Sequence, residues 1–343
     1  MRKTNIHAHV ILPEVLGKAG RYGPAIEETD DGRAAMRVGP YVSRVALGRG
    51  LTAGALHRMG DATVRLGEMD ERGIDKMCVS ASPLFYLYWA EPEIAVPFAQ
   101  VQNDALAAYC QADPSRLFFF STLPLPDIAA SIDEVERTTA MGARAVNVGT
   151  DDLGGLELDS EEMWPLYDAI AKAGLPLFVH PYPSPMAAGQ PDKYNLSWVV
   201  GYTSQETTAF ARLTLGGVFD DFPSLQVSIT HGGGAVPFQI GRLEMGRELQ
   251  PDVRAKKSIA EYVRTNVFFD ILVHDLAARR FLVDSVGADR LLVGDNYGGW
   301  DAADGFAMLD ELGLDEADAE AIAWRNAEAL FRLAPVGEEE KGS

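Results

Sequence analysis

The chain has 343 residues, 47% of them hydrophobic, which is enough for a sizeable core in one large α/β domain or two smaller ones. Its 50 acidic and 30 basic side chains give a formal net charge of −20. Such a surface repels nucleic acid and anionic membranes, which argues against both as partners. A small anionic substrate is still compatible, because a metal ion and a few arginines set the local field of a site.

Cysteine usage and the start of the chain bear on the compartment. The two cysteines, Cys78 and Cys110, lie far apart and form no Cys-x-x-Cys motif, so we expect neither a disulfide framework nor a thiolate zinc site. The first four residues lead into a strand without an apolar signal segment, and no run approaches about 18 apolar residues. The sequence therefore predicts a soluble protein in the cytoplasm.

The first predicted strand, residues 5–10, carries His7 and His9. Side chains two apart in a strand point to the same face, so the two imidazoles should lie side by side. Residues 11–61 show no clear periodicity and are too long for a plain loop, which indicates an insertion or cap over the mouth of the fold. Asp61 is a suitable N-cap for a helix through Glu71, with Gly73 just after its end.

From there strand-like and helical segments alternate. With the first strand they make eight units, which predicts a single distorted (β/α)₈ barrel over residues 1–335. A charged tail at 336–343 follows the last helix. The predicted strands are 76–80, 117–122, 143–148, 175–180, 225–230, 266–271 and 291–294, and the helices are 93–112, 128–141, 160–173, 204–216, 259–264, 276–286 and 316–332.

Histidines recur at the ends of these strands. His180 and His231 each end an apolar run, and the pair Asp295-Asn296 follows the last strand. Because the carboxyl ends of parallel strands meet at one rim of a barrel, these groups should converge. We expect His7, His9 and His180 to bind one divalent metal, for which neutral imidazole is a suitable ligand.

His231 precedes three glycines and is better suited to proton transfer, because small neighbours leave room for substrate and its pKa range allows exchange near neutrality. His57, in the predicted cap, is expected at the surface. His274 could orient a ligand or serve structure alone. Arg37 and Arg242, the latter on a helix after His231, could each grip a substrate carboxylate or form an ordinary surface ion pair.

Several short motifs together resemble the amidohydrolase superfamily, in the branch typified by α-amino-β-carboxymuconate-ε-semialdehyde decarboxylase and related aromatic-acid decarboxylases. They extend from the first strand to the seventh and are Ile6-His-Ala-His9, Glu68-Met-Asp-Glu-Arg-Gly73, Tyr88-Trp-Ala-Glu-Pro92, Phe178-Val-His-Pro181, His231-Gly-Gly-Gly-Ala-Val-Pro-Phe238 and Leu272-Val-His-Asp275.

The resemblance implies a (β/α)₈ barrel with a single divalent metal, zinc in most members and manganese in some, and often a homodimer. It assigns the metal to His7, His9 and His180 and the acid/base role to His231. Arg242 matches a family arginine that reaches the substrate carboxylate of the neighbouring subunit, and Arg37 matches less closely. Phe85, Tyr182 and Trp198 lie near strand ends and are expected to shape the substrate pocket.

One position departs from the family. Gly294-Asp-Asn-Tyr-Gly298 stands where the family usually has Gly-Thr-Asp-Tyr-Pro, so the family's aspartate falls on Asn296 and Asp295 replaces the threonine. Asparagine offers an oxygen but has no titratable proton. Because strand neighbours point to opposite faces, Asp295 could replace that aspartate only if the strand end were bulged or shifted.

Three functions follow as hypotheses. The leading one is metal-dependent, non-oxidative decarboxylation of an aromatic or muconate-like acid, with a metal-activated water and His231 as acid/base. The second is hydrolysis of an amide or lactone, or hydration of a double bond, at the same site. The third is a carboxylate-binding protein whose catalysis is weakened by Asn296.

Overall fold

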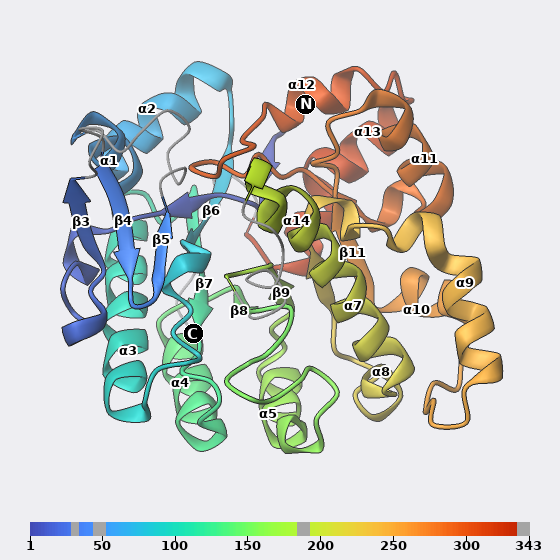
Figure 1. The fold of residues 1–343 in the computed structure, drawn as a ribbon. Helices are drawn as coiled ribbons and strands as arrows, with labels where there is room; N and C mark the ends of the chain where they lie inside the picture. Colours follow the sequence, from blue (N-terminus) through green and yellow to red (C-terminus); the bar gives the residue numbers. More distant parts are fainter. Residues whose placement is uncertain (29–33, 44–52, 184–192, 335–343) are drawn as a thin grey trace.

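The computed structural model describes residues 1–28, 34–43, 53–183 and 193–334 (Figure 1). A nearly closed barrel of eight parallel staves forms its centre, with helices outside, so the predicted (β/α)₈ architecture is confirmed. The first stave is split into β1 (Thr4–Asn5) and β2 (His9–Val10), both paired with β6. The others are β6 (Lys76–Ala81), β7 (Leu117–Thr122), β8 (Ala145–Val148), β9 (Leu177–Val179), β10 (Val227–Ile229), β11 (Val267–Asp270) and β12 (Leu291–Leu292).

The register of these staves aligns their carboxyl ends. Val179 of β9 lies opposite Val148 of β8 and Ile229 of β10, and Ile229 in turn lies opposite Phe269. Bridges from Asn5 to Val293 and from Ala8 to Tyr297 close the barrel between its first and last staves. Side chains that follow these strand ends therefore emerge at one rim.

The barrel interior is filled by apolar side chains, because strands covered by helices outside and packed inside have no face toward water. Phe120 and Phe178 are fully buried, and their ring centroids lie 5.0 Å apart. Phe331, from the last helical segment, packs against Phe120 at 4.9 Å. Burial of each such ring stabilises the fold by about 1.5–3 kcal/mol. The residues at the carboxyl rim therefore lie on a packed apolar core.

Helices surround the barrel, and most lie close to the predicted positions, whereas the short helices at 218–221 and 305–310 were not predicted. They are α2 (Ala62–Arg72), α3 (Pro92–Cys110), α4 (Ile128–Ala140), α5 (Trp164–Ala173), α7 (Tyr202–Leu215), α8 (Val218–Asp221), α9 (Val236–Leu249), α10 (Ile259–Thr265), α11 (Leu276–Val286), α12 (Gly305–Asp310), α13 (Glu316–Glu320) and α14 (Asn326–Leu330). Helix α2 has the predicted caps: Asp61 accepts a hydrogen bond from the Thr63 amide at 2.8 Å, and Gly73 ends the helix in the left-handed conformation. A π-helical turn, Ala321–Arg325, joins α13 to α14.

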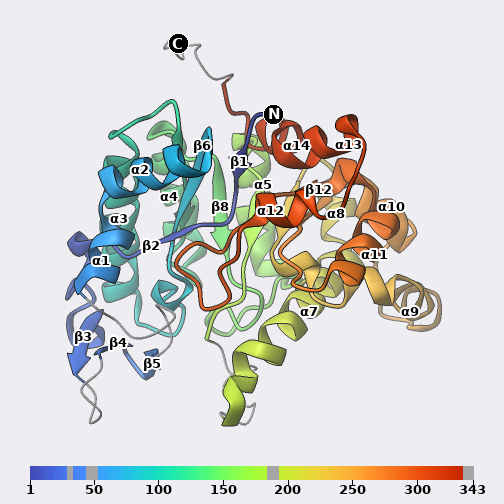
Figure 2. The same ribbon diagram turned by 90° about the horizontal axis from the view of Figure 1, so that it is seen from above.

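The segment between β2 and α2 has more structure than its irregular sequence suggested. It forms a three-stranded antiparallel sheet of β3 (Ala25–Glu28), β4 (Ala34–Val38) and β5 (Tyr41–Ser43), followed by α1 (Ala53–Gly60). Trp89 packs edge-on against Tyr22 at 4.7 Å, which ties this segment to the loop after β6. Figure 2 shows the small sheet and the start of α7 projecting on the same side of the barrel, away from the two termini. Parts of the predicted cap, 29–33 and 44–52, and the predicted tail, 336–343, lie outside the described residues.

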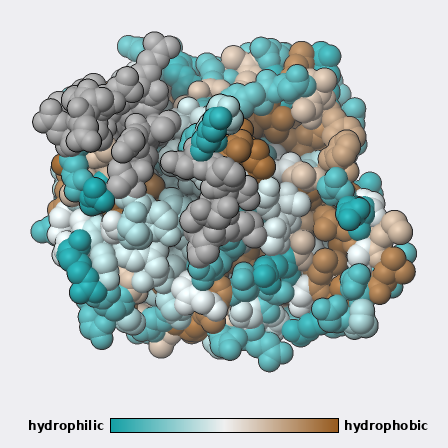
Figure 3. All heavy atoms as spheres, viewed as in Figure 1, coloured by the Kyte–Doolittle hydropathy of each residue, from teal (hydrophilic) through white to brown (hydrophobic). Residues whose placement is uncertain are grey.

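Both cysteines are buried and free. Within the described ranges, no helix is both long and apolar enough to cross a membrane. The face in Figure 3 is mostly hydrophilic, with hydrophobic residues visible at its upper right and at the right-hand edge, where α9 lies in Figure 1.

Candidate active site

Three imidazoles meet at the carboxyl rim of the barrel. His7 and His9 come from the split first stave, and His180 directly follows β9. The Nε2 atoms of His7 and His180 lie 3.1 Å apart, and one nitrogen from each of the three rings falls within 4.8 Å of the others. All three residues are at most 3% exposed. The structure thus brings together the three predicted metal ligands in a geometry that can hold one ion.

The remaining nitrogen of each ring is held by the protein. Asp270, the last residue of β11, lies 2.8 Å from His7 Nδ1 through its Oδ2, and Ser80 Oγ lies 3.1 Å from His9 Nδ1. His180 Nδ1 donates to the Pro181 carbonyl at 2.6 Å. Such partners fix the orientation of the ring and leave the other nitrogen for a metal.

The three rings are also neutral in this environment. Burial lowers the pKa of His7 and of His180 well below the usual value, and neighbouring histidines lower both further. Burial lowers the pKa of His9 to about 4. A metal ligand must be unprotonated, so these shifts favour binding of a cation at neutral pH.

His231 lies beside this cluster but has a different partner. Its ring centroid is 5.2 Å from that of His7, and its Nδ1 is 2.7 Å from Oε1 of Glu206, a fully buried carboxylate on α7. Thr230 also donates a hydrogen bond to this oxygen. Burial by itself lowers the pKa of His231, but Glu206, together with Asp301 and Asp270, outweighs burial and raises it to about 10. His231 can therefore hold a proton at the rim where the other three imidazoles cannot.

The three glycines after His231 pack against protein. A Cβ atom at Gly232 would lie 2.6 Å from Val273, and one at Gly233 would lie 2.4 Å from the Phe269 ring. A Cβ atom at Gly234 would lie 2.1 Å from the Thr203 carbonyl oxygen. The glycines allow a tight turn that places His231 against α7 and β11, and the space beside them is filled by protein rather than open to substrate as expected.

The end of β12 separates the two residues of the Asp295-Asn296 pair. Asp295 forms an ion pair with Arg72 at 2.7 Å and accepts a hydrogen bond from the Gly305 amide at 2.8 Å, both away from the imidazoles. Asn296 adopts a left-handed backbone, with φ of 46°, and lines the same cavity as His9, His180 and His231. Its side-chain nitrogen donates a hydrogen bond to Asp301.

A narrow cavity of about 50 Å³ opens beside these groups. Trp198 lines it and stacks on Tyr202, with ring centroids 5.5 Å apart, and Trp300 lines it from the loop after β12. Two predicted pocket residues are not among its lining. Phe85 is buried edge-on against Phe98 at 6.3 Å, and Tyr182 donates its hydroxyl to the Asp152 carbonyl.

The two predicted arginines lie away from the cavity. Arg37 on β4 forms an exposed ion pair with Glu27 at 2.6 Å. Arg242 is exposed on α9. His57 is 64% exposed and lies 3.5 Å from Asp61, as expected of a surface histidine. His274 is 57% exposed and lies 3.4 Å from Asp301.

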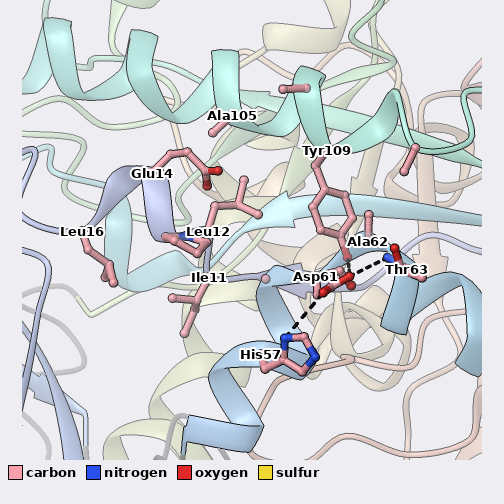
Figure 4. A pocket seen from close by; sticks show the side chains of 14 residues that line it. Ile11, Leu12, Glu14, Leu16, His57, Asp61, Ala62, Thr63, Ala105 and Tyr109 are labelled. Atoms are coloured by element: carbon pink, nitrogen blue, oxygen red, sulfur yellow. Dashed lines mark hydrogen bonds and ion pairs between the residues drawn. The ribbon is translucent and has the colours of Figure 1, made fainter.

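A separate cavity of about 550 Å³ lies between the segment after β2, the start of α2 and one face of α3 (Figure 4). Ile11, Leu12 and Tyr109 form much of its wall, and the His57–Asp61 pair lies at its edge. It contains none of the four rim histidines.

Sequence reasoning missed three carboxylates of the site. Asp270 stands at a strand end, so the rule that identified His180 could have found it. Glu206 lies within an amphipathic helix, 25 residues before the histidine that it contacts, and no local pattern marks it. Asp301 is one of three acidic residues in the loop 293–304, five positions after Asn296, and no local pattern distinguishes it.

Comparison with known proteins identifies the family of this chain. The family model for amidohydrolases matches residues 4–333. A 2-amino-3-carboxymuconate-6-semialdehyde decarboxylase from Dictyostelium discoideum is 32% identical over 241 residues, which cover 69% of this chain and 66% of that protein. A gamma-resorcylate decarboxylase from a Polaromonas strain is 29% identical, over 80% of this chain and 87% of that protein. A 2-keto-4-carboxy-3-hexenedioate hydratase from a Sphingobium strain is also 29% identical, over 76% of this chain and 79% of that protein.

Among solved structures, 5-carboxyvanillate decarboxylase from Novosphingobium aromaticivorans, complexed with manganese and 4-hydroxy-3-methoxy-5-nitrobenzoic acid, superposes with a TM-score of 0.81. The sequences are 23% identical over 97% of this chain and 96% of that chain, so this likeness concerns the fold. The family match covers nearly the whole chain, from the first stave to the last helix. The protein therefore belongs to the amidohydrolase family.

Proposed function

We propose that this protein is a metal-dependent, non-oxidative decarboxylase of an aromatic or muconate-like carboxylic acid. One observation carries the proposal: His231, held by a buried carboxylate, lies beside three neutral imidazoles at the same rim. A cation site next to a proton donor suits a reaction in which a carbanion forms and is then protonated. The relatives that decarboxylate related acids support this assignment.

The donor set fits a single divalent metal held by His7, His9 and His180. Three neutral nitrogens converge, and Asn296 Oδ1 is a buried oxygen without a hydrogen-bond partner among the described residues. Three nitrogens and an oxygen suit zinc, our first choice, and also manganese. When bound, the ion would orient the substrate and stabilise the negative charge that develops as the carbon–carbon bond breaks.

The protein's own groups carry the proton. The bond between the substrate carbon and its carboxyl carbon breaks, carbon dioxide leaves, and the electron pair stays on the carbon. Because Nδ1 of His231 faces Glu206, Nε2 is the ring nitrogen that exchanges a proton with the cavity. Glu206 stabilises the protonated ring before transfer, and Nε2 then delivers the proton to the substrate carbon.

Substrate binding requires some opening of the site. The cavity of about 50 Å³ is below the roughly 300–1,000 Å³ of typical ligand pockets. Trp198 and Trp300 line it from segments outside the barrel strands, so their displacement would enlarge it most directly. Their flat rings suit a planar, conjugated acid.

Two further assignments from the sequence stay predictions. A homodimer is supported by exposed apolar side chains on α9, the helix that carries Arg242. In such a dimer Arg242 would lie near the neighbouring active site and contact the substrate carboxylate. Arg37 is paired with Glu27, so we assign it no such role. Cytoplasmic location is likewise a prediction.

The decisive experiment combines metal content with product analysis. We expect about one zinc or manganese per chain, and carbon dioxide release from a panel of hydroxybenzoic and muconate-type acids. Chelation should abolish release and added metal should restore it. His180→Ala should lose the metal and the activity, whereas His57→Ala, at an exposed histidine outside the cavity that His180 lines, should keep both. Carbon dioxide release that persists without metal would disprove the proposal.

A hydratase is the second candidate, because one relative of comparable identity is named as such. Hydration would yield a product heavier by one water, and hydrolysis would yield products whose combined mass is that of the substrate plus one water. Neither would release carbon dioxide. Metal binding without any turnover would instead favour the carboxylate-binding alternative that Asn296 raises.

A further inference from the structure

The loop after β12 places a carboxylate behind the asparagine of the cavity. Asn296 is 4% exposed and lines the cavity with His9, His180 and His231. Asp301, five positions later, accepts a hydrogen bond from Asn296 Nδ2 through Oδ1. The Asp301 side chain is 13% exposed, and its Oδ2 lies 3.4 Å from His274.

This hydrogen bond fixes the orientation of the amide. A carboxylate accepts hydrogen bonds, so it selects the NH₂ side of the asparagine and turns the carbonyl oxygen away from itself. That oxygen, Asn296 Oδ1, is buried and has no hydrogen-bond partner among the described residues. A buried acceptor without a partner is unfavourable, so this oxygen is available to another group.

Asp301 is the acidic residue at this strand end whose carboxylate faces the asparagine of the cavity. Asp295, the other acidic residue at this strand end, is instead occupied by Arg72.

We propose that Asn296 and Asp301 act as one amide–carboxylate pair in the metal site. Asn296 Oδ1 is the oxygen donor to the cation, and Asp301 is a positioning residue that orients the amide and supplies the negative charge. Together the two residues provide the oxygen donor and the negative charge that a single aspartate at position 296 would provide. This inference rests on the metal site of the proposed function and adds Asp301 as the partner of its oxygen donor.

Metal affinity of the purified, metal-stripped protein tests the pair, with manganese or zinc titrated against a competing chelator. We expect Asp301→Asn to weaken binding by about 10–100-fold, as is usual when a partner of a metal ligand is lost. Asn296→Leu, which keeps Asp301 but removes the oxygen, should weaken binding as well. The double variant Asn296→Asp/Asp301→Asn should recover at least the parent affinity, because it moves the carboxylate to position 296.

Asp304→Asn is the matched control. It removes a charge from the same loop, and asparagine can keep the cap that Asp304 provides to the Phe306 and Ala307 amides. Its affinity should equal that of the parent. Thermal unfolding of each metal-free variant separates loss of binding from loss of fold.

Unchanged affinity in Asp301→Asn or in Asn296→Leu would overturn the inference, and so would a double variant as weak as Asp301→Asn. If Asp301→Asn does not fold, the metal affinities of Asn296→Leu and of the double variant still test the inference. Because the readout is metal binding, a failure to find carbon dioxide release would disprove the proposed reaction without affecting this result.

Discussion

At the scale of single residues, the site separates two kinds of histidine by their partners. His7, His9 and His180 are buried with lowered pKa values, and each has one nitrogen held by a protein group. His231 is raised to a pKa of about 10 by the carboxylates around it, Glu206 above all. The same side chain therefore serves as a neutral ligand or as a proton carrier, depending on whether a buried carboxylate lies within hydrogen-bond distance.

Glu206→Gln tests, in the metal-free protein, whether Glu206 keeps His231 protonated. The pKa of His231 should fall from about 10, because the variant removes the charge that outweighs burial. A raised pKa means that the pair stabilises the fold fully below the unfolded-state value of about 6.5, and that this stabilisation is lost as the pH rises through about 10. We expect the variant to be less stable by on the order of 3 kcal/mol near neutral pH.

The difference in unfolding temperature between parent and variant should shrink as the pH is raised from 7 to 10. Glu134→Gln provides the control, because Glu134 is also buried but pairs with Arg137, whose charge does not change in this range. A difference that stays constant with pH for Glu206→Gln as well would contradict the assigned ion pair.

At the scale of elements, the turn between β10 and α9 determines where His231 lies. Gly234 has φ of 62° and ψ of −118°, a conformation that is essentially closed to other residues, and α7 leaves no room for a Cβ atom. Gly234→Ala should therefore destabilise the fold by on the order of 2–3 kcal/mol. It should also reduce activity, because the displaced carbonyl belongs to Thr203, one helical turn before Glu206.

Gly67→Ala is the matched control for this substitution. Gly67 lies within α2, and a Cβ atom there would meet nothing within 4 Å. A helical glycine replaced by alanine gains about 0.5–1 kcal/mol, so this variant should be slightly more stable than the parent. Unfolding in denaturant compares the two. Equal stability of both variants would show that the turn tolerates a side chain.

The elements also show how much of the fold and of the site can be predicted from the sequence. Apolar runs such as 117–122 and 225–230 predicted barrel strands, because buried parallel strands need apolar side chains on both faces. The sheet of β3, β4 and β5 was not predicted, since its short strands are stabilised by pairing with one another and by Trp89 from a distant loop. The histidine positions followed from strand ends, whereas Glu206 and Asp301 depend on contacts that form only in the folded chain.

At the scale of the whole molecule, exposed apolar side chains are unevenly distributed. A net charge of −20 keeps most of the surface hydrophilic, but Phe238, Met245 and Leu249 on α9 are 76%, 59% and 68% exposed. With Arg242 they are spaced by three or four residues, so they share one face of the helix. Phe281 of α11, 6.0 Å from Phe238, extends this apolar face to the neighbouring helix.

Exposed apolar side chains in a continuous row indicate an interface, and a second copy of this chain is the partner that the family resemblance predicts. In a two-fold dimer this face would meet its own copy, and Arg242, in the same row, would be carried toward the neighbouring subunit. We expect the purified protein to sediment as a dimer. The double variant Met245→Asp/Leu249→Asp should sediment as a monomer, because four added carboxylates would face one another across the interface.

Ile26→Asp is the control, since Ile26 is an apolar side chain, 40% exposed, on the distant small sheet. That variant should remain dimeric.

The dissociated double variant Met245→Asp/Leu249→Asp should keep its metal, because His7, His9 and His180 all belong to one chain. Its KM for a carboxylate substrate should rise, because Arg242 of the partner is lost. Arg242→Ala in the intact dimer should raise KM to the same extent. A monomeric parent protein, or a monomeric double variant with unchanged KM, would contradict this prediction and show that one subunit forms the whole active site.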